Sequence, residues 1–177
     1  ITILSLSTAR RRRLQAATGL LQLQVDGKPT LLSDTSWPGY EDIPRSVMAG
    51  YTVMSSEAME QWPLDAPPTH VFLQGGCGGM AAAIGIDLWS RSGEDRPRIV
   101  IVEPEPAACL YESATAGELR MVDITTETVM AGLSCGEVSL VAWPVIAAAG
   151  PVVAVGRGPV VAAAPRAAAP RYVPSAH

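Results

Sequence analysis

The sequence predicts an α/β protein with a parallel, or mostly parallel, sheet covered by helices. Two short apolar segments, His70–Gln74 and Arg98–Pro104, alternate with stretches that have helical spacing. A cluster of glycines over 75–79 also separates the first of these strands from the helix that follows it. In open α/β sheets, ligands bind at such junctions, at the carboxyl ends of the strands.

The first 25 or so residues give the weakest pattern. Residues 9–24 contain a possible helix that ends near Gly19, and the turn sequence Asp-Gly-Lys-Pro follows it. A short strand is predicted over 30–34. A loop is predicted over 35–40, where Pro38 and Gly39 interrupt regular structure.

A long amphipathic helix should begin near Pro44, because proline suits the first turn of a helix. Apolar residues recur at three- and four-residue spacing and predict the buried stripe, with Ser55 on another face. The members of the stripe are Val47, Tyr51, Met54, Ala58 and Trp62.

The chain then continues to alternate strands and helices. His70–Gln74 is expected to be a short buried strand, and a helix of small residues should run from Gly78 to Trp89. Arg98–Pro104 is the clearest strand, since most of its apolar residues are β-branched. The remaining elements are predicted as a helix over 107–114, a short strand over 120–124 and a helix over 127–133.

The composition changes abruptly at Pro151. From there to His177 the chain is nearly all Ala, Val, Pro, Gly and Arg, and it has no acidic residue. We expect no packed structure in this low-complexity tail. It is either disordered or the product of a shifted reading frame, and the abruptness of the change favours the second explanation.

Composition and charge exclude several classes of function. The net charge of −4 gives no reason to expect a nucleic-acid partner, and no apolar run reaches the length of a membrane span. The chain opens with Ile1, and its apolar start precedes the arginines at 10–13, the reverse of a secretory signal. We therefore expect an internal piece of a longer, cytoplasmic protein.

The cysteines do not predict a disulfide or a metal site. Cys77, Cys109 and Cys135 are odd in number and far apart in the sequence. The two histidines do not complete a zinc-ligand pattern with them. We expect three reduced thiols in packed or loop positions.

The glycine cluster predicts an anion site. Helix N-termini offer unpaired N–H groups, and glycines let these groups approach a phosphate. Gly78 and Gly79 are followed by Met80, which excludes the Gly-Lys-Ser/Thr loop of nucleotide hydrolases. A dinucleotide fingerprint is a weak match, because Ala81 replaces its last glycine and Glu103 is its only candidate acid. A tight turn with no ligand is the alternative.

Four blocks, in order, resemble the second half of diaminopropionate ammonia-lyase. They are SDTSWPGYEDIPRSVMAGYTVMSSEAMEQ, PTHVFLQGGCGGMAAA, RIVIVEPEPAACLY and TVMAGLSCGE, and the resemblance covers about 31–143. This family has fold type II, the fold of the tryptophan-synthase β-subunit. Its cofactor is pyridoxal phosphate, and it eliminates both amino groups of the amino acid 2,3-diaminopropionate to give pyruvate and ammonia. The resemblance also implies homodimeric relatives and three regions: a poorly matched segment 1–30, a partial cofactor domain 31–150 and the tail 151–177.

The resemblance implies roles for particular residues. The cofactor-phosphate loop would consist of Gly75, Gly76, Cys77, Gly78 and Gly79. Asp34 matches an acidic active-site position, where it would meet a substrate ammonium or move a proton. Trp37 and Tyr40 would either line the same cleft or simply pack. Glu103 would contact the cofactor region or cap a turn. Cys135 and Glu137 lie in a matching block, but no role follows for them.

The lysine that holds the cofactor lies in the family's first half, which has no counterpart in this sequence. The single lysine here, Lys28, lies in a turn sequence outside any such motif. We therefore expect an inactive fragment of the lyase. The alternatives are a related type II dehydratase or β-replacing enzyme, and a phosphate-binding remnant without catalysis.

Overall fold

The computed structural model describes residues 21–25, 28–63, 65–126, 131–150, 152–157 and 160–163. Its main sheet has the order β3-β4-β5-β6. Strands β3 (His70–Gln74), β4 (Arg98–Pro104) and β5 (Val152–Arg157) are parallel, and β6 (Val160–Ala163) runs antiparallel to β5. The predicted class, α/β with a mostly parallel sheet, is confirmed.

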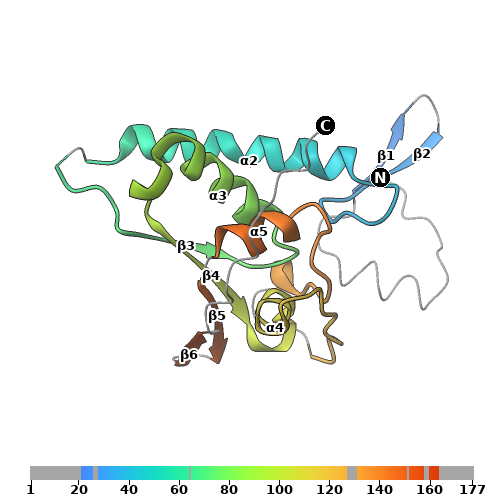
Figure 1. Cartoon of the computed structure of the whole chain (residues 1–177). Helices are drawn as coiled ribbons and strands as arrows, with labels where there is room; N and C mark the ends of the chain where they lie inside the picture. The colour runs from blue at the N-terminus through green and yellow to red at the C-terminus, as the bar shows by residue number, and fades with distance from the viewer. Residues whose placement is uncertain are drawn as a thin grey trace, which may run out of the picture.

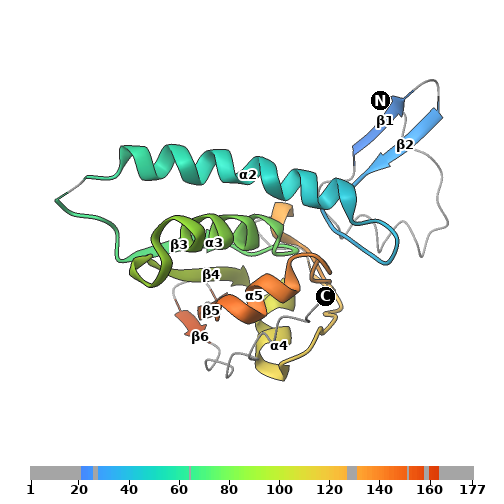
Figure 2. The ribbon, with the colours of Figure 1, turned by 45° about the horizontal axis from the view of Figure 1, so that its top comes forward.

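Two long helices form layers beside the sheet. Helix α3 (Gly79–Ser92) lies between the strands and helix α2 (Asp42–Gln61), as Figure 1 and Figure 2 show. Its residues from Ala81 to Gly85 are all buried, because both faces of the helix are covered. Small side chains make this close packing possible: a methyl group on Gly85 would lie 3.3 Å from Cδ1 of Ile99 on β4.

The predicted buried stripe of α2 is wrong in part. Met54 is 46% exposed, whereas Met48 and Ser55 are buried. Tyr51 and Trp62 do pack against the core, as expected. Ser55 turns inward because its hydroxyl donates a 2.5 Å hydrogen bond to Oδ2 of Asp87 on α3. An apolar pattern cannot show such a polar contact between helices.

Strand β3 is an edge strand, and the prediction that it is buried is wrong. Leu73 is buried, but Phe72 on the other face is 69% exposed. Phe72 pairs in register with Val100 on β4, which is only partly buried. One face of the sheet therefore packs against helices, while the face that carries Phe72 is open in the described part of the chain.

The expectation of no packed structure after Pro151 is wrong for the first residues of the tail. Val152–Arg157 form β5 beside the clearest strand of the sequence, β4. Val153 is 1% exposed and belongs to the core. Alternating Val and Ala residues suit a buried parallel strand, and proline-free backbone from 152 to 157 leaves its hydrogen bonds available. Residues 164–177 lie outside the described residues.

The remaining elements surround the carboxyl ends of the strands. After β4 come a 3-10 turn, η2 (Glu105–Ala107), and helix α4 (Cys109–Ala116). The strand predicted over 120–124 is wrong: this segment is irregular, and the amide of Val122 donates to the carbonyl of Gly136 rather than to a sheet. Residues 127–130 of the predicted helix lie outside the described residues, and its end forms a 3-10 turn, η3 (Ala131–Leu133).

Helix α5 (Trp143–Ala149) was not predicted. Pro144 in its first turn and Gly150 at its C-cap, with φ of 55°, are the sequence signals that mark it. Another short 3-10 turn, η1 (Gly93–Asp95), joins α3 to β4.

An antiparallel hairpin precedes the α/β body. It consists of β1 (Leu21–Val25) and β2 (Lys28–Leu32), and it projects away from the main sheet in Figure 1 and Figure 2. Lys28 thus begins β2 rather than lying within a turn. The predicted helix ending near Gly19 lies outside the described residues. No helix in the described ranges has the length and apolar character needed to cross a membrane.

Candidate functional site

The glycine segment 75–79, here called the glycine loop, follows the carboxyl end of β3 and leads into α3. Its first residue packs too tightly for any side chain: a methyl group on Gly75 would lie 2.5 Å from Cγ of Glu103 and 2.9 Å from Cγ2 of Ile101. The Gly75 amide also donates to the carbonyl of Val102 at 2.7 Å. The start of the loop is therefore fixed to β4.

The rest of the loop is shaped by a left-handed residue. Gly78 has φ of 91° and caps α3, a conformation that glycine adopts without steric strain. Among the described residues, the amides from Gly76 to Gly79 donate no backbone hydrogen bond outside the regular elements. These N–H groups stand at the amino end of a 14-residue helix, where its dipole favours an anion.

The segment that contains Asp34 lies against this loop. The position of a methyl group on Gly79 is 4.0 Å from the carbonyl oxygen of Asp34. Burial raises the pKa of Tyr51 on α2, and the Cys135 contact and burial raise the pKa of Cys77 in the loop; the Asp34 charge adds to both shifts. The structure thus brings together Asp34 and the glycine loop, which are more than 40 residues apart in the sequence.

Serine residues connect three separate segments at this place. The hydroxyls of Ser36 and Ser139 are 2.7 Å apart, and the Ser36 amide donates to Ser139 Oγ at 3.1 Å. The Ser139 amide in turn donates to the carbonyl of Cys77 at 2.8 Å. Both serines are buried. The sequence analysis gave neither of them a role, since a buried serine has no local signature.

Burial raises the pKa of Asp34, and hydrogen bonds from its own backbone and from Thr35 partly oppose this. The side chain is only partly exposed. A carboxyl group in this state holds its proton more readily than a solvated aspartate does. It can therefore accept or release a proton nearer to neutral pH.

Glu103 is a buried carboxylate under the loop. It is 0% exposed, and its oxygens accept the amides of Leu110 at 2.9 Å and Tyr111 at 2.7 Å in the first turn of α4. Burial raises the pKa of Glu103 to about 7, while these two amides lower it. Of the two expectations for Glu103, capping is the contact observed. The cap is on a helix, and the same side chain supports Gly75.

Cys109 and Cys135 interact with each other and Cys135 with Cys77 of the loop, and all three are free, buried thiols. Interaction with Cys109 and burial raise the pKa of Cys135 to about 12, although Cys77 opposes this. The Cys135 contact and burial likewise raise the pKa of Cys77 well above its ordinary value. Thiols in this state are protonated at neutral pH and are poor nucleophiles. No group of metal-ligating side chains occurs in the described parts of the chain.

Trp37 and Tyr40 organise the Asp34 loop. Their rings stack at 4.2 Å, and the Tyr40 hydroxyl accepts the amide of Ser33 at 2.9 Å. This is the packing role that the sequence allowed for them. Glu137 is exposed, and its carbonyl accepts the thiol of Cys135 at 3.1 Å.

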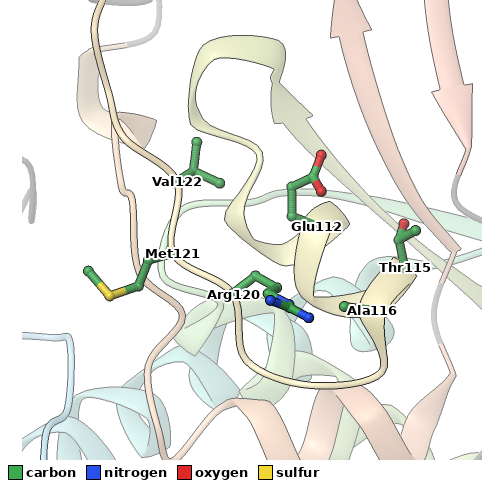
Figure 3. A pocket seen from close by; sticks show the side chains of 6 residues that line it. All are labelled: Glu112, Thr115, Ala116, Arg120, Met121 and Val122. Carbon is green, nitrogen blue, oxygen red and sulfur yellow. The ribbon is translucent and has the colours of Figure 1, made fainter.

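A surface pocket of about 510 Å³ lies elsewhere, beside α4 and the segment after it. Figure 3 shows Glu112 and Arg120 among its side chains. Arg120 is already paired with Glu118, and the lining residues include neither Asp34 nor any residue of the glycine loop. We therefore do not place the site in this pocket.

The glycine loop fits a phosphate group. Its amides from Gly76 to Gly79 have no backbone partner outside the regular elements among the described residues, and they stand at a helix N-terminus. Ser134, which follows η3, adds a buried hydroxyl that has no partner among the described residues. The loop has no lysine beside it that could bind a cofactor aldehyde covalently. The single lysine of the sequence, Lys28, lies on the projecting hairpin.

Comparison with known proteins identifies the family. A family model described as pyridoxal-phosphate dependent enzyme matches residues 8–174. Diaminopropionate ammonia-lyase of Salmonella typhimurium is 42% identical over 120 residues, which cover 66% of this chain and 30% of that protein. The chain therefore spans less than a third of the length of this relative.

Comparison with solved structures points to the same family. The holo diaminopropionate ammonia-lyase of Escherichia coli has a TM-score of 0.58 at 38% identity, over 65% of this chain and 28% of that one. The same enzyme in complex with an aminoacrylate–PLP azomethine intermediate has a TM-score of 0.57 at 37% identity, over 65% and 29%. The expected resemblance and the expected cofactor are thus confirmed. The chain belongs to the family of pyridoxal-phosphate-dependent enzymes.

Proposed function

We propose that this chain is a part of an ammonia-lyase that converts 2,3-diaminopropionate and water to pyruvate and two molecules of ammonia. The observation that carries the proposal is the meeting of three segments at the carboxyl edge of the sheet. The Asp34 segment, the glycine loop and the Ser139 segment are joined by the bonds among Ser36, Ser139 and Cys77. The Asp34 segment and the glycine loop belong to blocks that resemble the lyase, and Ser139 follows the last of these blocks by two residues.

Each group has a part in this proposal. The amides from Gly76 to Gly79 bind the cofactor phosphate at the helix N-terminus. Pyridoxal phosphate, when bound, supplies the electron sink for the negative charge that develops at the substrate α-carbon. Asp34 faces the bound amino acid and either accepts a proton from it or pairs with one of its ammonium groups. Its raised pKa suits the first of these tasks.

The same proposal predicts that the chain does not act alone. Enzymes of this chemistry hold pyridoxal phosphate through a lysine. Lys28 lies on the hairpin away from the glycine loop. The proposal therefore requires a lysine other than Lys28, the single lysine of this sequence. The resemblance implies that related family members are homodimers, and we expect the complete protein to be a homodimer too.

A chimera tests the proposal. The 120-residue segment of the Salmonella typhimurium enzyme that matches this chain is replaced by the corresponding residues of this chain. Release of the 2-oxo acid product is then measured: pyruvate from 2,3-diaminopropionate and serine, and 2-oxobutanoate from threonine. We expect the chimera to release pyruvate from the diamine in preference to the two hydroxy amino acids, and the isolated chain to release none.

Variants of the chimera separate the roles. Asp34→Asn should lower kcat by about a hundredfold or more, the usual contribution of a general acid or base. Gly76→Asp should weaken cofactor binding by placing a negative charge beside the phosphate. Gly76→Ala is its matched control, since a methyl group there meets only Leu133, at 3.9 Å. A chimera that folds, binds the cofactor and prefers threonine would contradict the proposed substrate.

A further inference from the structure

Ser134 has a buried hydroxyl without a hydrogen-bond partner. It is 8% exposed, and its Oγ is the one buried side-chain oxygen or nitrogen in the described ranges that makes no hydrogen bond. The other buried serines near it behave differently: Ser36 and Ser139 bond to each other, and Ser113 accepts the amide of Arg120. An unmade hydrogen bond at a buried hydroxyl is unfavourable. It therefore points to a group that completes it.

The neighbours of Ser134 on both sides contact the glycine loop. Leu133 places Cδ2 3.9 Å from the position of a methyl group on Gly76. The Cys135 thiol interacts with Cys77. The Cys135 amide donates to the carbonyl of Leu133 at 2.8 Å, which makes a tight turn with Ser134 at its centre. Ser134 is thus held against the loop whose amides are free.

We propose that the Ser134 hydroxyl donates a hydrogen bond to the phosphate of pyridoxal phosphate bound at the glycine loop; this rests on the function proposed above. A phosphate offers strong acceptors, and a hydroxyl is a donor that needs no charge. The ionisable side chains shown to act on the loop, Asp34 and Glu103 among them, are all acidic. Neutral donors therefore carry phosphate binding here, and Ser134 adds one to the backbone amides.

The apo protein distinguishes a ligand role from a structural one. Ser134→Ala removes no hydrogen bond that the described residues make, so it should leave the urea midpoint of the unliganded chain unchanged or raise it. Ser139→Ala is the matched control, because it removes the bonds to the amide and hydroxyl of Ser36. It should lower that midpoint.

Binding measurements then test the phosphate contact. The affinities of wild type and Ser134→Ala are measured by fluorescence titration with pyridoxal phosphate and with pyridoxal, which lacks the phosphate. Inorganic phosphate is added as a competitor. We expect Ser134→Ala to weaken pyridoxal phosphate about tenfold, the effect of one hydrogen bond to a charged group. The affinity for pyridoxal should not change, and inorganic phosphate should compete less well in the variant.

Each of the other outcomes contradicts one part of the proposal. Unchanged affinity for pyridoxal phosphate in Ser134→Ala would mean that the hydroxyl is only buried or holds a water. An equal loss for pyridoxal would place it at the ring, and a lowered urea midpoint would make its role structural. If wild type itself binds pyridoxal phosphate no better than pyridoxal, the phosphate-loop role falls, and the Ser134 contact falls with it.

Discussion

The substitution Glu103→Gln tests how an ionisable side chain in the core makes the free energy of unfolding depend on pH. The substitution keeps the shape of the side chain but removes its titration. In the wild type, the buried carboxylate accepts two amides of α4, from Leu110 and Tyr111. Glutamine can accept one of them through its carbonyl oxygen, while its amide group meets the other as a donor.

The magnitude follows from the pKa of Glu103, which burial raises from 4.5 to about 7. This difference makes ionisation in the folded protein less favourable by about 3 kcal/mol than in the unfolded chain. A raised pKa means that the folded state holds the proton longer. The contribution of Glu103 to stability is therefore complete below pH 4.5 and is lost as the pH rises through about 7.

The measurement is urea unfolding of wild type and variant from pH 4.5 to 8.5. The free energy of unfolding of Glu103→Gln, minus that of wild type, should rise by about 3 kcal/mol across this range. Other titrating groups, Asp34 among them, cancel in the difference. Gln61→Ala, an exposed substitution at the end of α2 that removes no ionisable group, is the control and should give a flat difference.

Two results would refute this reasoning. A flat difference for Glu103→Gln would mean that the carboxylate is solvated and titrates as in the unfolded chain. A falling difference would mean that the two amides outweigh burial, so that the charged form is the stable one. In that case Glu103 would act as a normal helix-capping carboxylate.

Three further predictions concern packing and thiols. Gly75→Ala should destabilise the fold by several kcal/mol, because its methyl group would overlap Glu103. Gly50→Ala, in an open position on α2, should stabilise the fold by about 0.5–1 kcal/mol. Chemical unfolding measures both changes. Leu73→Ala should lower the free energy of unfolding by about 2–4 kcal/mol and Phe72→Ala by less than about 1 kcal/mol, since only Leu73 is buried; similar losses would show that the open face is covered in solution. The three buried cysteines should react slowly with Ellman's reagent at pH 7.5 and rapidly, all three, in denaturant. A fast thiol in the native chain would contradict the burial of the three thiols and, at Cys77 or Cys135, the raised pKa.

Local patterns of the sequence predicted the elements that carry the glycine loop. A β-branched run followed by proline indicated β4, and small residues after glycines indicated α3. These signals are short-range, because they depend on backbone preference and on the size of each side chain. The roles of Asp34 and of the loop residues stay predictions.

Local patterns misled where a segment depends on distant partners. The tail was read by its composition, but Val152–Arg157 gain their hydrogen bonds from β4, about 50 residues earlier. Phe72 was expected to be buried, but β3 lies at the edge of the sheet. Ser55 was assigned to the outer face of α2 because its partner, Asp87, lies on another helix.

The sequence by itself determined the α/β class, the glycine junction and the resemblance to a cofactor-dependent lyase. Each of these depends on residues that are close together in the chain. Only the tertiary structure decided which groups surround that junction: the Ser36–Ser139 link, the buried Glu103, and the Ser134 hydroxyl, which has no partner among the described residues. Their roles depend on contacts between distant segments and on removal from water, which no single stretch of sequence encodes.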